Sequence, residues 1–431
     1  MKILLYIFFC MATFPAMGAG APNAGELHRA EKALTDVIVH DIFSPPVASR
    51  IYLYANVAAY ETLVRAYPGD YRSLYGQVKA FPDLPVPGEK IDGSLAAVYA
   101  FLMVGEKLVF SESILEDSLQ AIVDNYRRSL ARPVYDASLR YGVLVADSIM
   151  AWADKDQYKE TRKLPRYRFI KKEGKWIPTP PAYMAAIEPY WNRIRTVTLD
   201  SCSQFRTAPP PAFSKDTGSV FYQQAYDVYV AGNQLTQEQK DIANFWDCNP
   251  FAVTMEGHLH YAVKKISPGG HWMSIVGIAA RQKGLSMLES SAVYTMASIA
   301  LFDAFIACWD EKYRSNVIRP ETYINAYINE GWRPVLQTPP FPEYVSGHSI
   351  ISQSTAVVLS GMLGDQFSFN DSSEVEFGLP VRHFPSFLAA AEEAAISRFY
   401  GGIHYRVAIE GGLVSGDEIG RWVLRRIRLK Q

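Results

Sequence analysis

The sequence predicts an all-α protein. Apolar residues recur with helical spacing along most of the chain, and prolines and glycines separate the periods. The sequence has no internal repeat, no low-complexity tract and no sustained alternation typical of strands. A hydrophobic content of 49% in 431 residues is enough for a large core. The expected helices span residues 27–42, 51–66, 94–109, 114–130, 134–152, 220–230, 236–245, 284–309, 346–363, 387–400 and 404–427.

These elements group into four stretches of chain. A cleaved signal peptide is expected at 1–20, followed by an N-terminal helical layer at 21–157. Residues 158–215 are rich in proline and aromatic residues, which predicts an irregular segment that wraps over the helices. A helical core at 216–431 then carries the candidate site.

The first residues have the pattern of an export signal. Lys2 gives a short basic region, residues 3–14 form an apolar run, and residues 16–18 offer a small-residue cleavage site. We therefore expect export to the periplasm or the medium. Lipid anchoring at Cys10 is the less favoured alternative, because the residues before it match a lipoprotein signal poorly.

Charge and hydropathy exclude two classes of partner. A net charge of -1 and a pI near 6.7 give no general electrostatic reason to bind nucleic acid or an acidic membrane. The most membrane-like stretch after the signal is 290–309, but Asp303 interrupts it. We expect a buried core helix there and no integral membrane span. The choice between a monomer and a homo-oligomer stays open.

Three cysteines remain after the signal, namely Cys202, Cys248 and Cys308. An odd number in an oxidising compartment allows at most one disulfide within the chain, and a pairing of Cys202 with Cys248 is a guess. None of the three has the spacing of thiolate metal ligands. His271 has two interpretations, either a residue that lines a pocket mouth or a loop histidine packed on Trp272.

A first pair of cations is Lys312 and Arg319, seven positions apart and followed by Pro320. On a continuous helix seven residues make about two turns, so both cations could face one point. Pro320 would then end the helix or change its direction. The alternative interpretation is a solvated basic helix end.

Ser346, Gly347 and His348 precede an apolar helical run. A helix N-terminus presents unpaired N–H groups and the positive end of the helix dipole, which favour an anion. Gly347 would let the backbone approach a ligand closely, and His348 could act as a general acid or base. The alternative is an ordinary serine cap.

A third element is Arg398, which is followed by two glycines and then by His404. A neutral imidazole at His404 could donate a lone pair to a metal-like centre or to phosphorus. Taken alone, this spacing indicates nothing.

The three elements together, in this order on one helical chain, resemble the vanadium-dependent haloperoxidase and type 2 phosphatidic acid phosphatase superfamily. The strings 341–344, 245–250 and 270–272 are similar to bacterial haloperoxidases in particular. The resemblance implies a helical bundle with an oxyanion site between its helices.

The resemblance also implies a role for each residue. Lys312, Arg319 and Arg398 would neutralise the oxygens of the oxyanion. Ser346 and Gly347 would complete the cradle with backbone N–H and hydroxyl groups.

The two histidines would lie on opposite sides of the oxyanion. His404 would ligate the vanadium of vanadate, or attack phosphorus to give a phosphohistidine. His348 would be the acid–base partner on the other side.

Three functions follow from this resemblance. The first is an exported haloperoxidase that binds vanadate as cofactor and uses peroxide to oxidise halide. The second is a soluble periplasmic acid phosphatase that takes a phosphate ester into the same site. The third is a noncatalytic homologue that retains the oxyanion site.

The third function is motivated by departures from the family pattern. The family has an aspartate four residues after the ligand histidine, where this sequence has Ala408. Four residues are about 40° around a helix, so that carboxylate would have lain beside His404 and oriented its ring. Glu410 lies on another face and is not expected to replace it. Val345, just before Ser346, and Ile318, just before Arg319, are softer departures from the family pattern.

Overall fold

The computed structural model describes residues 24–256, 259–262 and 264–430. The predicted signal peptide and Cys10 lie outside these residues. The prediction of an all-α class is confirmed, because helices form nearly all the regular structure described. The helices are α1 Gly25–His40, α2 Pro45–Ala66, α3 Gly93–Glu106, α4 Glu112–Ser129, α5 Arg132–Ala153, α6 Tyr158–Thr161, α7 Val220–Asn233, α8 Gln237–Phe245, α9 Pro268–Lys283, α10 Met287–Ser315, α11 Pro320–Tyr327, α12 Gly347–Leu363, α13 Phe387–Tyr400 and α14 Arg406–Arg426.

Two hairpins interrupt the helices. Strands β1 Val253–Glu256 and β2 Leu259–Ala262 pair antiparallel between α8 and α9. Strands β3 Phe369–Asp371 and β4 Arg382–Phe384 pair antiparallel between α12 and α13, with Phe369 opposite Phe384. The sequence did not predict these strands, because each is too short to show a clear alternation.

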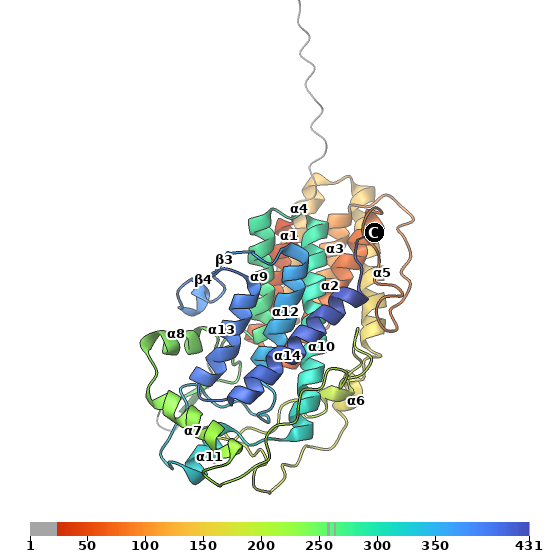
Figure 1. The fold of residues 1–431 in the computed structure, drawn as a ribbon. Helices are drawn as coiled ribbons and strands as arrows, with labels where there is room; N and C mark the ends of the chain where they lie inside the picture. The colour runs from red at the N-terminus through yellow and green to blue at the C-terminus, as the bar shows by residue number, and fades with distance from the viewer. Residues whose placement is uncertain (1–23, 257–258, 263, 431) are drawn as a thin grey trace, which may run out of the picture.

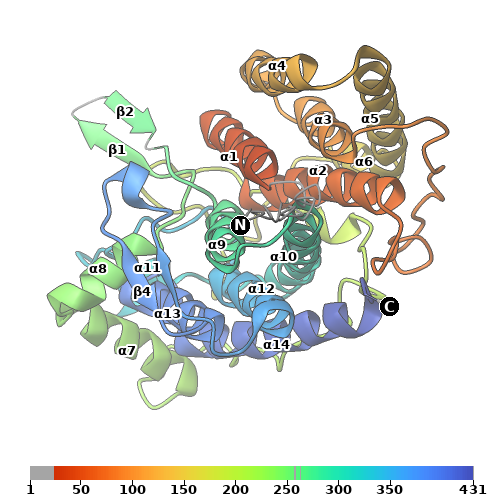
Figure 2. The ribbon, with the colours of Figure 1, turned by 90° about the horizontal axis from the view of Figure 1, so that it is seen from above.

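The helices pack in layers around α10 (Figures 1 and 2). Helices α1 to α5 form one side of the molecule, where α2 packs on both α3 and α10. Helices α12, α13 and α14 form the other side, and α12 contacts α10 directly. The most apolar window of α10 is completely buried, which confirms that 290–309 belongs to a core helix.

Most predicted helices form close to their predicted bounds. Thr236 caps α8 in a capping box with Gln239, and Ser346 caps α12 through its side chain. Pro45, one of the prolines between the expected helices, lies in the first turn of α2, where a missing N–H costs nothing. Helix α9 was missed; Ser267 caps it and Pro268 begins it.

An irregular segment joins α6 to α7 and contains only the short 3-10 helix η1, Trp191–Arg193. It runs across the end of α10. The Trp176 N–H donates to the Asn316 carbonyl at 3.2 Å, and the Ile187 N–H donates to the Pro340 carbonyl at 3.2 Å. The segment thus braces the loops that follow α10 and precede α12.

Four helix ends meet at one end of the bundle. Helices α10 and α13 end there, while α12 and α14 begin there. In Figure 1 this is the lower end of the core. The chemistry predicted from the sequence lies at this junction.

Candidate functional site

The three sequence motifs converge on a small buried cavity. Gly347, His348, Arg398 and His404 line it together. Arg319 is not one of the lining residues but contacts one of them, with its Nη1 atom 3.2 Å from Nε2 of His404. The residues that the sequence singled out are therefore brought together from helix ends that are distant in sequence.

Lys312 lies in the last turn of α10 and does not line the cavity. Its ammonium donates to the carbonyls of Pro342 at 3.1 Å, Glu343 at 3.0 Å and Val345 at 2.5 Å. All three of its hydrogens are thereby used. Lys312 contributes positive charge and holds the loop before α12, but it has no free donor. Burial lowers its pKa to about 8.

Arg319 is not on a continuous helix with Lys312, which corrects the two-turn interpretation. Helix α10 ends at Ser315, and Asn316 in the left-handed region (φ 52°) turns the chain. Arg319 is then the N-cap of α11, and Pro320 occupies the first helical position. The turn, rather than helical pitch, aims the guanidinium inward.

The Arg319 guanidinium is only partly satisfied by the protein. Nε donates to the Phe341 carbonyl at 2.9 Å and Nη1 to the Ile403 carbonyl at 2.9 Å. Nη2 is buried and has no hydrogen-bond partner. Burial lowers the pKa of Arg319 to about 10, which leaves it cationic at neutral pH. A buried unpaired donor of this kind needs an acceptor.

Arg398 lies in the last turn of α13 and faces the cavity from another side. Its Nη1 donates to the Trp246 carbonyl at 2.8 Å, while its buried Nε has no partner. The nearest carboxylate oxygen, Oδ1 of Asp247, is 3.9 Å from Nη2. Arg398 therefore retains donor capacity and much of its charge for a ligand.

His404 is oriented by Glu343, which the sequence analysis did not identify as functional. Nδ1 of His404 lies 2.8 Å from Oε1 of Glu343. The same oxygen accepts from the Tyr405 N–H at 3.0 Å. Nε2 faces Arg319 Nη1, which can only donate. The proton is thus on Nδ1, and Nε2 presents a lone pair.

The environment also holds both histidines neutral. Burial lowers the pKa of His404 well below its usual value, and Arg319 adds to this effect. Burial likewise lowers the pKa of His348 well below its usual value, and Arg398 adds to it. Neutral imidazoles are the form that can ligate a metal centre or accept a proton.

Glu343 supplies the carboxylate that Ala408 lacks. The expectation that Ala408 leaves His404 without an orienting partner was therefore wrong. Ala408 is completely buried, and its carbonyl accepts from the Ser346 N–H at 3.0 Å. Burial raises the pKa of Glu343 to about 7, while the cations Arg319 and Lys312 oppose this shift.

The Ala408→Asp variant is therefore expected to lose stability without gaining activity. Burying a second carboxylate at this completely enclosed position costs roughly 2 to 5 kcal/mol. Chemical denaturation and a vanadate titration measure the two effects. Val414→Asp, at an exposed position of the same helix, is the control. A more active Ala408→Asp protein of unchanged stability would contradict this assignment.

The N-terminus of α12 forms the floor of the cavity. The Ser346 side chain accepts from the Ser349 N–H, which leaves its hydroxyl hydrogen to donate. The first-turn N–H groups at Gly347 and His348 have no acceptor within the helix. A Cβ on Gly347 would meet only Trp309, at 4.0 Å. Nε2 of His348 is buried without a partner.

The cavity fits a small tetrahedral anion. Its volume is about 40 Å³, and a single water needs roughly 10 to 15 Å³. Three buried nitrogens without partners belong to residues around it: Arg319 Nη2, Arg398 Nε and His348 Nε2. Excess positive charge and unpaired donors are the chemistry that holds vanadate or phosphate. The remaining lining is mostly apolar, from Pro45, Pro250, Phe251, Pro268, Phe305, Trp309, Pro339 and Phe341.

Two other sequence interpretations were wrong. Cys202, Cys248 and Cys308 are all free thiols, so the guessed pairing of Cys202 with Cys248 does not form. His271 neither lines the cavity nor packs in a loop. It is completely buried in the first turn of α9 and stacks on Trp246, with ring centroids 4.5 Å apart.

Comparison with known proteins agrees with this geometry. Residues 292–430 match the family described as the VCPO second helical-bundle domain. The structure of the first bacterial vanadium-dependent iodoperoxidase is 47% identical in sequence, with a TM-score of 0.90, over 95% of this chain and 97% of that one. A search of curated proteins gave no match.

Two further structures show the same fold at lower identity. The holo form of a bacterial vanadium-dependent chloroperoxidase is 18% identical with a TM-score of 0.68, over 96% of this chain and 99% of that one. The apo form is 16% identical with a TM-score of 0.64, over 89% and 95%.

A helical bundle with a buried cationic cluster at a helix N-terminus defines a class of oxyanion-site enzymes. Within that class, this chain belongs to the vanadium-dependent haloperoxidases and is an oxidoreductase.

Proposed function

We propose that the cavity binds vanadate and that the enzyme uses peroxide to oxidise iodide. The observation that supports this most strongly is a set of buried nitrogens without partners. Two belong to residues that line the cavity, Arg398 and His348, and one belongs to Arg319, which contacts the lining residue His404. The iodide assignment is supported by the 47% identity with an iodoperoxidase. Iodide is also the most easily oxidised of the common halides, so it requires the least activation.

Different residues supply the contacts that would hold the anion. Arg319 Nη2 and Arg398 Nε would donate to its oxygens, together with the first-turn N–H groups of Gly347 and His348. Lys312 would add positive charge without a direct contact. His404 would ligate vanadium through Nε2, because Glu343 keeps the proton on Nδ1. Bound vanadate supplies a centre that activates peroxide towards halide.

His348 is the proposed acceptor of the proton from peroxide. His348 lines the same cavity and is held neutral, and its buried Nε2 has no partner, so this nitrogen can accept a proton from an entering hydroperoxide. Burial of the site excludes bulk water, which strengthens the electrostatic contacts around the reacting atoms. The phosphate-ester alternative would use the same atoms.

Parallel assays test this function. Purified protein loaded with vanadate is given peroxide with iodide, bromide or chloride, and phosphate-free protein is given a chromogenic phosphate ester. We expect iodide oxidation that depends on added vanadate and exceeds that of the other halides. Ester hydrolysis without iodide oxidation would establish the phosphatase instead. Vanadate binding without either activity would establish the noncatalytic homologue.

Vanadate affinity is expected to fall above about pH 8. An anion prefers the protonated form of Lys312, and the protonated fraction decreases as pH rises through its pKa of about 8. The loss approaches about tenfold per pH unit. Lys312→Arg keeps the charge, so its affinity should fall less steeply. Ionisation of vanadate itself is common to both proteins and cancels in the comparison. Parallel pH profiles would refute the role of Lys312.

We also propose that the protein is exported, on the strength of the basic and apolar residues at 2–14. Cell fractionation and N-terminal sequencing of the mature protein test this. A mature chain that begins near residue 20 supports export, and a cytoplasmic chain that begins at Met1 contradicts it.

A further inference from the structure

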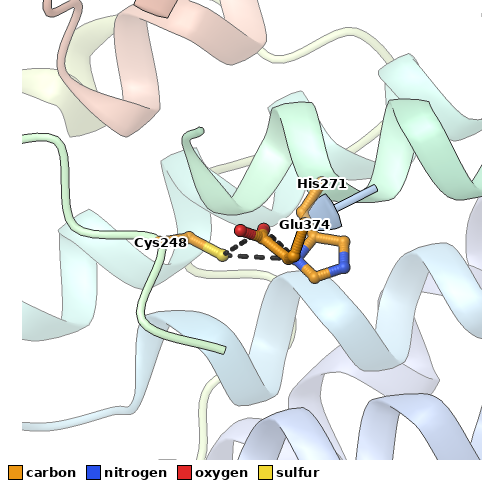
Figure 3. Close-up of side chains that lie close together, drawn as sticks. All are labelled: Cys248, His271 and Glu374. Atoms are coloured by element: carbon orange, nitrogen blue, oxygen red, sulfur yellow. Dashed lines mark hydrogen bonds and ion pairs between the residues drawn. The ribbon is translucent and has the colours of Figure 1, made fainter. Parts of the chain in front are cut away.

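A second cluster of chemically active side chains lies beside the oxyanion cavity. It consists of Cys248, His271 and Glu374, which Figure 3 shows converging from separate segments. Cys248 follows α8, His271 lies in the first turn of α9, and Glu374 follows strand β3. All three are buried. Cys248 also lines the oxyanion cavity, whereas the other two do not.

The three potential ligand atoms have the spacing of a tetrahedral metal site. Cys248 Sγ lies 3.3 Å from His271 Nδ1, and Glu374 Oε1 lies 3.1 Å from the same nitrogen and 3.9 Å from the sulfur. Zinc bonds of about 2.0 to 2.3 Å to oxygen, nitrogen and sulfur require separations of about 3.3 to 3.6 Å between tetrahedral ligands. The observed triangle therefore needs shifts of only a few tenths of an ångström.

A carboxylate behind the histidine completes the pattern. Asp371 Oδ2 lies 2.7 Å from Nε2 of His271, on the opposite side of the ring from the cluster. The other Asp371 oxygen is held by the N–H and hydroxyl of Ser373. In the metal-bound form a proton on Nε2 alone would leave the Nδ1 lone pair facing Cys248 and Glu374. Metal-bound histidines are usually supported by such a carboxylate.

The ligand charges suit a dication. When bound as ligands, a Cys248 thiolate and a Glu374 carboxylate carry two negative charges in a buried setting, and a divalent ion neutralises both. Mixed sulfur, nitrogen and oxygen ligands at tetrahedral spacing suit Zn²⁺. Mg²⁺ and Ca²⁺ prefer oxygen alone.

We propose that Cys248, His271 and Glu374 bind Zn²⁺, with a water in the fourth position. The ion would fasten the segment that walls the oxyanion cavity. Trp246 in that segment stacks on the His271 ring at an interplanar angle of 16°, and its carbonyl accepts from Arg398. The proposed Zn²⁺ site takes no part in the halide chemistry itself, and this proposal goes beyond the proposed function.

Metal content and cobalt spectroscopy test the proposal without any assay of turnover. Full-length mature protein is purified without a metal-affinity step and analysed by mass spectrometry for metals, with one Zn²⁺ per chain expected. After removal of zinc by a chelator, Co²⁺ is added in the absence of vanadate. A thiolate-to-cobalt charge-transfer band in the near ultraviolet is expected, with visible bands of four-coordinate cobalt.

Three variants locate the ion. Cys248→Ser should remove the charge-transfer band, and Cys202→Ser, the matched control at a cysteine outside the cluster, should retain it. Asp371→Asn keeps the ligands and should weaken Zn²⁺ affinity roughly 10 to 100-fold. Glu374→Gln, whose side chain has nearly the same shape, should also weaken Zn²⁺ affinity. This variant provides the test if Cys248→Ser does not fold.

The proposal is overturned by either of two results. Wild-type protein that binds neither Zn²⁺ nor Co²⁺ would make the cluster a metal-free hydrogen-bond network. Metal affinity that is unchanged in both Asp371→Asn and Glu374→Gln would place the ion elsewhere. Neither result bears on vanadate binding, so a failure here is distinct from a failure of the proposed function.

Discussion

His404→Ala is expected to lower vanadate affinity by at least about 100-fold and to abolish vanadate-dependent iodide oxidation. The lone pair on Nε2 of His404 is fixed by contacts on both sides of the ring, from Glu343 and from Arg319. Alanine removes the ligand and leaves Glu343 buried without the Nδ1–H donor. The expected loss of affinity therefore has two parts: the missing bond from the imidazole and the cost of burying Glu343 without its hydrogen-bond donor.

Vanadate titration by calorimetry measures this loss, and circular dichroism checks folding. His383→Ala is the matched control, because His383 is exposed in β4 and bonds only to Asn370 among the contacts described. Retention of wild-type vanadate affinity in His404→Ala would refute the assignment of the ligand.

Glu343→Gln is expected to reduce vanadate affinity and activity roughly 10 to 100-fold. Glutamine keeps the shape but removes the charge that stabilises the Nδ1–H. Its amide can also donate to Nδ1, which would move the imidazole proton to Nε2 and block the lone pair. The variant thus tests orientation of the ring rather than its presence.

Two readouts separate this role from a merely structural one. Nitrogen NMR of labelled histidine should report the Nδ1–H tautomer of His404 in the wild type and a shift towards Nε2–H in Glu343→Gln. Glu321→Gln is the control, since Glu321 is a buried carboxyl that bonds to Thr338 instead. Equal losses in both variants would indicate destabilisation alone.

The site chemistry was largely predictable because it depends on residue type and order. Gly347 and Arg398, which the motifs singled out, line one cavity, and Ser346 caps the helix that begins there. Glu343 was not predictable by the same argument. The family pattern places the carboxylate partner of His404 four residues later, at Ala408. The observed partner of His404 comes instead from a loop that is distant in sequence.

The fold was predictable where a side-chain cap marks the start of a helical period, as in α8, α12 and α13. The break after α10 was not, because Asn316 in a left-handed conformation ends the helix without a glycine or proline at that point. The cluster at His271 was also missed. Its ligands lie in three distant segments, and ligand spacing along the sequence detects only local sites.

A crystal structure of the vanadate-soaked protein tests the central claim most directly. We expect a vanadium atom bonded to Nε2 of His404, with its oxygens near Arg319, Arg398 and the N-terminus of α12. Vanadium bound elsewhere, or a cavity that stays free of it at saturating vanadate, would contradict the account.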